Sequence, residues 1–187
     1  MRIIAGKMKG TSLFITPNKN TRPLKDMVRE SIFNLLTHSN KFLFQIEKSS
    51  ILDLYAGTGS FGLECLSRNA DNVSFIEKDK MAIKILEENI EKLKVKKKIN
   101  IYFIDVINFI KKNINNKYDL IFCDPPFKNK DIDNLVNLIY SKKLLKKNGI
   151  IIIHRNKNVS DKFPNSFKVL EERCYGISKV IFGKILP

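Results

Sequence analysis

The chain has 187 residues, of which 43% are hydrophobic, with a formal net charge of +15 and a pI of about 9.7. This length favours one domain with a small extension, and no apolar run approaches the ~18 residues that a membrane-spanning helix needs. The N-terminus also lacks the charged, apolar and small-residue order of a signal peptide, so we expect a cytoplasmic protein with no membrane contact.

The cysteines and histidines disfavour disulfides and metal sites. The three cysteines, Cys65, Cys123 and Cys174, are widely spaced, and each lies among apolar residues. An odd number of cysteines in this pattern fits reduced packing residues better than a disulfide framework. The two histidines, His38 and His154, are far apart in sequence, so we expect no zinc or other metal site.

The positive charge indicates a polyanionic partner, with nucleic acid the first candidate. Only 6 of the 34 basic residues are Arg, and Ile and Asn are also abundant. An AT-rich genome would enrich Lys, Ile and Asn whatever the function, although that bias would not by itself hold the acidic residues at 19. The basicity therefore supports nucleic-acid binding without separating RNA from DNA.

Residues 1–40 are predicted to form a small basic extension to the main domain, residues 41–187. Basic and apolar positions alternate over residues 1–16. Glycines flank a short stretch that contains Lys7 and Lys9, which predicts a β-hairpin with basic residues at its tip.

A helix over residues 26–36 follows, because apolar residues recur there at helical spacing. Arg22 and Arg29 would project from this part of the extension. The residues alone leave two interpretations open: solvated charges, or side chains that contact phosphate groups.

From residue 50 the pattern alternates strands with helices, which predicts an α/β fold with a mostly parallel sheet and helices on both faces. The predicted strands are residues 51–55, 73–76, 99–104, 119–123, 150–154, 167–173 and 178–185. The predicted helices are residues 60–67, 79–94, 106–112 and 132–145, and Gly149 is predicted to turn the chain. The last two strands are expected to form an antiparallel pair around Tyr175-Gly176.

Acidic residues fall at or near the ends of successive predicted strands. Asp53 lies in the first strand and is followed by Gly57 and Gly59, a turn that lets backbone approach a ligand and directs a helix N-terminus at it. Glu77 ends the second strand, where an acid can accept hydrogen bonds from the ribose of NAD or of S-adenosylmethionine. Asp105 ends the third strand and is placed to accept from an adenine amine. The glycine spacing also fits a dinucleotide site.

The stretch Asp124-Pro125-Pro126-Phe127 ends the fourth predicted strand. Two prolines cannot continue a central strand, so the stretch is either a simple strand terminator or a stiff loop that carries function. A dinucleotide enzyme has no use for these residues here, whereas an enzyme that methylates a planar amine does. The Asp124 carboxylate and the Pro125 carbonyl can accept hydrogen bonds from the N–H groups of such an amine, and Phe127 can stack on its base.

Residues 51–62 resemble motif I of class I S-adenosylmethionine-dependent methyltransferases, and Asp124–Phe127 resembles their (Asn/Asp)-Pro-Pro-(aromatic) motif. More narrowly, the chain resembles the bacterial 16S ribosomal RNA (guanine-966-N2) methyltransferase family, from residue 1 to about residue 153. The further segments that carry this resemblance are Arg2–Lys7, Thr21–Pro23 with Asp26, Val28–Glu30, Leu52–Gly59 and Gly62–Arg68.

This resemblance implies a Rossmann-like seven-stranded fold and methylation of the exocyclic N2 of a guanine in small-subunit rRNA. The implied substrate is an assembled or partly assembled 30S particle, and the implied cofactor is S-adenosyl-L-methionine. The implied catalytic residues are Asp124, Pro125 and Phe127. The implied cofactor-binding residues are Asp53, Ala56, Gly57, Gly59, Glu77, Lys78, Asp105 and Asp124. The implied RNA-binding residues are Lys7, Lys9, Arg22 and Arg29.

Two positions depart from the family pattern. Met8 stands where the family often has an aromatic residue, and His154-Arg155 follows the fifth strand where the family usually has an acid. We assign no role to His154 and Arg155 from the sequence.

Two other functions stay open. The first is an adenine-N6 or cytosine-N4 methyltransferase of RNA or DNA. The N-terminal residues that resemble the rRNA methyltransferase family argue against it. The second is a catalytically silent RNA-binding module, although such a protein would not need an intact Asp124 or glycine turn. Nothing in the sequence marks a self-complementary interface, so a monomer is expected.

Overall fold

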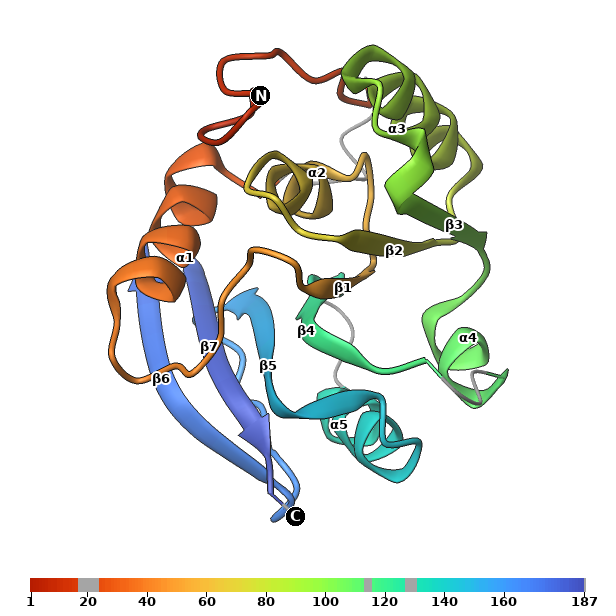
Figure 1. Cartoon of the computed structure of the whole chain (residues 1–187). Coiled ribbons are helices and arrows are strands. Elements are labelled where there is room, and N and C mark those ends of the chain that lie inside the picture. The colour runs from red at the N-terminus through yellow and green to blue at the C-terminus, as the bar shows by residue number, and fades with distance from the viewer. Residues whose placement is uncertain (17–23, 113–115, 127–130, 187) are drawn as a thin grey trace.

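The computed structural model describes residues 1–16, 24–112, 116–126 and 131–186. These residues form a seven-stranded sheet with helices on both faces (Figure 1). The strand order is β3-β2-β1-β4-β5-β7-β6, in which β7 is antiparallel to both of its neighbours and every other pair is parallel. The predicted Rossmann-like fold class is therefore confirmed.

The structure contains each predicted strand and helix. The strands are β1 (Ser50–Leu54), β2 (Asn72–Glu77), β3 (Ile99–Phe103), β4 (Tyr118–Cys123), β5 (Leu145–Asn156), β6 (Phe167–Tyr175) and β7 (Ser178–Ile185). The helices are α1 (Asp26–His38), α2 (Ser60–Ser67), α3 (Lys80–Leu93), α4 (Val106–Lys112) and α5 (Ile132–Ser141), with a 3-10 turn η1 (Lys96–Lys98). The larger boundary errors all lie between α5 and β5.

The prediction that Gly149 turns the chain is wrong. Helix α5 ends at Ser141, and β5 already begins at Leu145, so Gly149 lies inside the strand. The register between β4 and β5 shifts near this point, and a Cβ added to Gly149 would lie 2.7 Å from Cγ of Leu145. The glycine therefore permits a strand irregularity, which sequence patterns do not distinguish from a turn.

The predicted N-terminal hairpin is present only as a short reversal of the chain. One isolated antiparallel bridge joins Arg2 to Ser12, and residues 1–16 contain no regular strand. The Ile3 amide donates to the Thr11 carbonyl over 2.9 Å, which closes the reversal. We call residues 1–16 the N-terminal arm.

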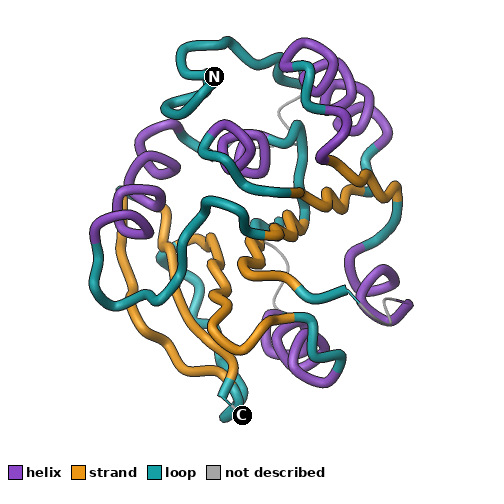
Figure 2. The backbone as a smooth tube through the Cα atoms, in the orientation of Figure 1, coloured by secondary structure: helices purple, strands orange, loops and turns teal. Residues whose placement is uncertain are grey.

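Two apolar cores fill the two faces of the sheet. One contains residues of the N-terminal arm and of α1, α2 and α3, and the other contains residues of α4 and α5. Figure 2 shows the strands as a central layer with helices to either side. Cys65 and Cys123 are buried as expected, whereas Cys174 is exposed on the edge strand β6. Among the described residues, no helix is both long and apolar enough to cross a membrane.

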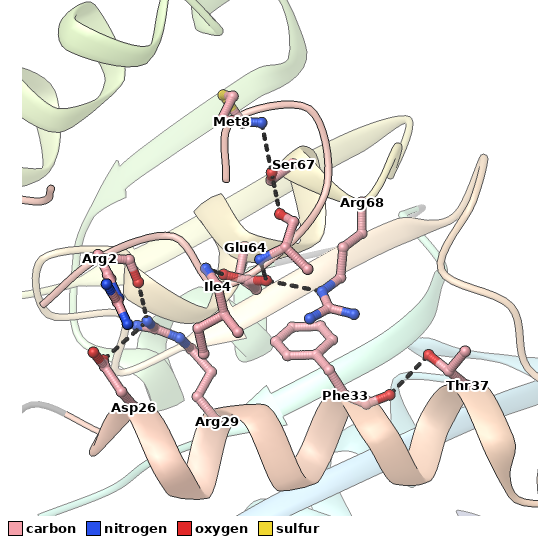
Figure 3. Close-up of polar contacts among 11 residues, drawn as sticks. Arg2, Ile4, Met8, Asp26, Arg29, Phe33, Thr37, Glu64, Ser67 and Arg68 are labelled. Atoms are coloured by element: carbon pink, nitrogen blue, oxygen red, sulfur yellow. Dashed lines mark hydrogen bonds and ion pairs between the residues drawn. The ribbon is translucent and has the colours of Figure 1, made fainter. Parts of the chain in front are cut away.

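A buried carboxylate on α2 holds the N-terminal arm. Glu64 is 0% exposed, and its oxygens accept from the amides of Ile4 (2.7 Å) and Ala5 (3.0 Å) and from Nε of Arg68 (2.8 Å), as Figure 3 shows. A buried carboxylate is tolerated only when such donors replace its water shell. Glu64 therefore joins the arm to α2.

The C-terminal end of α2 makes a second set of contacts with the arm. The Lys7 amide donates to the Ser67 carbonyl over 2.8 Å. The Met8 amide donates to the Ser67 hydroxyl over 3.0 Å, a contact that Figure 3 shows. Gly6 has a φ of +82°, and a Cβ there would lie 2.0 Å from the Ser67 carbonyl oxygen. Only glycine lets the arm cross the helix this closely.

Arg29 of α1 is a structural residue, which contradicts the RNA contact that we expected. Its side chain is 0% exposed, and its Nη2 donates to the Arg2 carbonyl and to Oδ1 of Asp26 (Figure 3). Burial lowers the pKa of Arg29, and the charges of Asp26 and Glu64 oppose that shift. The guanidinium joins α1 to the arm and is not available to phosphate.

Replacing Glu64 by Gln should loosen the arm. Gln keeps the side-chain size but removes the charge that holds Arg68, and its NH₂ group faces donors, so we expect a loss of about 2–3 kcal/mol in the free energy of unfolding. Urea unfolding measures the loss, and trypsin should cut faster after Lys7 and Lys9. The exposed Glu87→Gln on α3 is the matched control. Equal stability of the two variants would contradict a holding role for Glu64.

Candidate active site

The candidate site lies where the parallel strands end. The chain moves from β1 outward to β2 and β3 and then returns to β4 on the other side of β1, so the strand order reverses between β1 and β4. In open α/β sheets, ligands bind in the crevice at that point. The described acids of the predicted site all come from this edge: Asp53 from β1, Glu77 from β2, Asp105 after β3 and Asp124 after β4.

The turn after β1 has the backbone geometry that the glycines predicted. Gly57 has a φ of +55° and Gly59 a φ of +84°, and Gly59 directly precedes α2. A Cβ at Gly59 would lie 2.3 Å from Cδ1 of Leu86, whereas a Cβ at Gly57 would meet nothing within 4 Å. Gly59 is thus required for packing against α3, and Gly57 faces space in which a ligand can approach the backbone.

Two acids accept hydrogen bonds from the backbone of this turn and of the helix that follows it. Oδ2 of Asp53 accepts from the Gly62 amide over 3.0 Å, and Oε2 of Glu77 accepts from the Gly57 amide over 2.8 Å. Asp53 is only 1% exposed. Asp53 therefore holds the first turn of α2, directly after the glycine turn, and its buried carboxyl does not lie in open space.

The Asp53 carboxyl has a pKa raised well above its ordinary value. Burial is the largest cause, the hydrogen bond from Gly62 opposes it, and the nearby charges of Asp124 and Glu77 raise the pKa further. Asp53 therefore lies within electrostatic range of Asp124 and Glu77, and its raised pKa favours its neutral form.

Lys78 and Asp105 extend the site toward β3. Oε1 of Glu77 accepts from the amides of Lys78 and Asp79, each over 2.8 Å. Oδ1 of Asp105 accepts from the Ile107 amide over 3.0 Å, and its Oδ2 lies 3.2 Å from Nζ of the exposed Lys78. Both acids keep acceptor capacity, since each carboxylate oxygen has two lone pairs.

Asp124 continues the line of β4 into the Pro-Pro loop. Its amide donates to the Leu54 carbonyl over 3.3 Å, which extends the pairing of β1 and β4 by one residue. Its side chain is 20% exposed, Pro125 is buried, and Pro126 is exposed. Phe127 lies outside the described residues.

The sequence analysis missed the partner of Asp124. His154 is 6% exposed, and its Nδ1 lies 2.8 Å from Oδ1 of Asp124. Strands β4 and β5 are parallel neighbours in which Cys123 pairs with Ile153, so the next residue of each strand is Asp124 and His154. The placement of His154 at the end of the fifth predicted strand was the signal available in the sequence.

The remaining predicted site residues fall in three places. The Ala56 amide donates to the Ile76 carbonyl over 3.0 Å, so Ala56 is part of the turn that the glycines form. Lys7 and Lys9 are exposed on the N-terminal arm, as an RNA contact requires. Arg22 lies outside the described residues. No group of three or more metal-ligating side chains occurs among the residues that the structure places.

The arm also reaches the glycine turn through Asn89 of α3, which is 0% exposed. Its Oδ1 accepts from the Phe14 amide over 2.8 Å, and its Nδ2 donates to the carbonyls of Phe14 and Thr58, each over 3.1 Å. The arm and the glycine turn therefore share one buried side chain.

Together, the sheet topology, the glycine turn and the strand-end acids define a Rossmann-like methyltransferase of the S-adenosylmethionine-dependent class. A putative methyltransferase from Escherichia coli has the same fold, with a TM-score of 0.85 and 25% identity over 99% of this chain and 97% of that one. A putative methylase from Haemophilus influenzae aligns with a TM-score of 0.79 and 31% identity, over 100% of this chain and 98% of that one.

The chain belongs to the family described as "Conserved hypothetical protein 95", whose sequence model matches residues 1–184. It is 32% identical to the "Ribosomal RNA small subunit methyltransferase D" of Haemophilus influenzae, over 95% of this chain and 90% of that protein. The protein of the same name from Buchnera aphidicola is also 32% identical, over 91% of this chain and 86% of that protein.

Replacing Asp53 by Asn should stabilise the protein increasingly as the pH rises. A carboxyl whose folded-state pKa is raised stabilises the fold below its unfolded pKa, near 4, and this contribution is lost as the pH rises through the folded-state pKa. Asn does not ionise and keeps an oxygen for the Gly62 amide. Urea unfolding of both proteins between about pH 4 and pH 8 measures the difference. A difference that does not change with pH would contradict this account.

Proposed function

We propose that this protein transfers a methyl group from S-adenosyl-L-methionine to the exocyclic N2 of a guanine in 16S rRNA, within a 30S particle. The observation that carries this proposal is the Asp124-Pro125 loop at the point where the strand order reverses, beside the glycine turn of α2. The relatives named small-subunit rRNA methyltransferase D supply the class of RNA.

The residues of the crevice fit this cofactor. Gly57 faces open space, so backbone can approach the ligand closely. The sulfonium and amino groups of S-adenosylmethionine are cationic, and the carboxylates of Glu77 and Asp105, at the carboxyl ends of β2 and β3, suit a cationic ligand. The remaining lone pairs of Glu77 and Asp105 suit the ribose hydroxyls and the adenine amine.

When bound, S-adenosylmethionine supplies an electrophilic methyl group. The guanine N2 is a poor nucleophile, because its lone pair is delocalised into the ring. In our proposal the Asp124 carboxylate and the Pro125 carbonyl accept hydrogen bonds from the two N–H groups of this amine. These bonds hold the nitrogen in line with the methyl group and make its lone pair available. As the bond between N2 and the methyl carbon forms, the S–CH3 bond would break and S-adenosylhomocysteine would leave. N2 would release one proton to the Asp124 carboxylate or to water.

The surface around the arm suits an RNA substrate. Residues 1–25 contain no Asp or Glu, and Lys7 and Lys9 are exposed. A base inside folded RNA is not accessible to Asp124, so we expect the target base to be unstacked or flipped.

The decisive test is methyl transfer with identification of the product. The protein is incubated with tritiated S-adenosylmethionine and 30S particles from a strain that lacks the modification, and the labelled nucleoside is identified after digestion. Label in N2-methylguanosine supports the proposal. Label in a methyladenosine or methylcytidine, or no label when cofactor binding is verified, would overturn it.

Replacing Asp124 by Ala should abolish methyl transfer, with a loss in kcat of at least about 100-fold, because the amine loses its charged acceptor. Cofactor affinity should stay within about threefold, since the hydrogen bonds of the glycine turn do not involve Asp124. Single-turnover methylation and calorimetric titration with S-adenosylhomocysteine measure the two effects. A collapse of cofactor affinity would show that Asp124 belongs to the cofactor site instead.

Replacing Lys7 and Lys9 together by Gln should weaken RNA binding and flatten its salt dependence. Each lost phosphate contact lowers the slope of log K against log salt by about 0.7–0.9. The matched control is Lys111→Gln with Lys112→Gln, which removes two exposed charges from α4 on the opposite face of the sheet. Filter binding to 30S particles at several salt concentrations measures both. Equal slopes for the two double variants would remove Lys7 and Lys9 from the interface.

A further inference from the structure

We propose that His154 is a positioning residue for Asp124, which deepens the function proposed above and rests on it. Nδ1 of His154 holds Oδ1 of Asp124, and this contact fixes the carboxylate so that Oδ2 is presented to the target amine. This chain has His154 at the end of the fifth strand, where the family that it resembles usually has an acid.

The sheet places the two side chains on the same face. Ile152 and Phe122 belong to the core on the α1–α3 side, whereas Ile153 and Cys123 belong to the core on the α4–α5 side. Side chains alternate along a strand, so the next residues, His154 and Asp124, return to the α1–α3 side. This is also the side of Asp53, because its strand neighbour Ile51 belongs to the same core.

The direction of the hydrogen bond follows from the chemistry of its partners. An ionised carboxylate only accepts hydrogen bonds, so when Asp124 is ionised Nδ1 of His154 is the donor of the 2.8 Å contact. The His154 side chain is 7% exposed and that of Asp124 is 20% exposed. A hydrogen bond to a charged group in such a poorly hydrated place is stronger than one in water.

The backbone of His154 belongs to a regular strand. It pairs with Val180 in the antiparallel ladder of β5 and β7, in the interior of the sheet. The next residue, Arg155, is 0% exposed, and its Nη2 lies 2.9 Å from Oδ1 of the buried Asp161. The end of β5 is therefore fixed on both faces. Asp124, in contrast, lies in a loop past the end of β4, and a donor on a rigid neighbouring strand is suited to orient it.

A pair of substitutions separates positioning from packing. His154→Phe keeps the ring and its volume but removes the donor, whereas the amide nitrogen of His154→Asn lies close to the position of Nδ1. We expect Phe to lower kcat on the order of 10- to 100-fold with the KM for S-adenosylmethionine and for 30S within about threefold, and Asn to recover most of the loss. Equal loss in both variants, or none in Phe, would overturn the proposal.

A second measurement does not depend on activity. The chain has two histidines, and His38 is exposed near the end of α1, far from β5 in sequence, so it serves as an internal reference. In ¹⁵N–¹H spectra of the imidazoles, Nδ1 of His154 should carry a proton at neutral pH. Its resonances should shift in Asp124→Ala while those of His38 stay unchanged. An unprotonated Nδ1, or no shift in that variant, would refute the contact.

These readouts distinguish this inference from the proposed function. If the wild-type protein labels no guanine N2, the proposed function fails, and the imidazole spectra still report on the contact of His154 with Asp124. If the wild-type protein labels N2-methylguanosine but His154→Phe retains full kcat, only the positioning role fails.

Discussion

The arrangement of this molecule depends on one buried charge, the carboxylate of Glu64. It lies in α2, a helix of eight residues that begins directly after the glycine turn and ends at Ser67, which the N-terminal arm crosses. Because the helix is so short, the residues that hold the arm lie within about two turns of the glycine turn, on one rigid element. An ionised group without water requires all of its donors, so Glu64 fixes the arm in one position on the helix.

Packed aromatic side chains connect the region around Glu64 with the strand that leads to Asp124. The rings of Phe33 and Phe61 stack at 5.1 Å, and those of Phe61 and Phe122 at 3.9 Å, so an aromatic column runs from α1 through α2 into β4. Arg68, which Glu64 holds, lies 4.4 Å above the ring of Phe33 at the outer end of this column. Phe122 precedes Asp124 by two residues on the same face of β4. The arm and the candidate catalytic loop are thus packed into one body, although more than a hundred residues of sequence separate them.

Periodicity and turn chemistry predicted most of the fold, because buried parallel strands and the amphipathic α3 leave strong patterns in the sequence. The glycine turn and the strand-end acids were also predicted, since few structures need that spacing. Three features required the coordinates. Arg29 is buried against the Arg2 carbonyl, which lies in a distant part of the chain. Gly149 lies in an irregular strand, where its neighbour is the Leu145 side chain. The contact of His154 depends on which strands are neighbours, and a local pattern contains none of this information.

The charges of the molecule are separated by place, and this separation bears on how a nucleic acid would meet the site. The whole chain carries +15, yet Glu77, Asp105 and Asp124 gather at the carboxyl ends of its parallel strands. On the proposed function, this acidic edge of the sheet would attract a cationic cofactor and repel phosphate, so the RNA backbone would lie on exposed basic residues outside it. A neutral base is the part of RNA that can enter against this potential. On the proposed function, the electrostatics therefore favour a flipped or looped-out guanine over a base that is read within a helix.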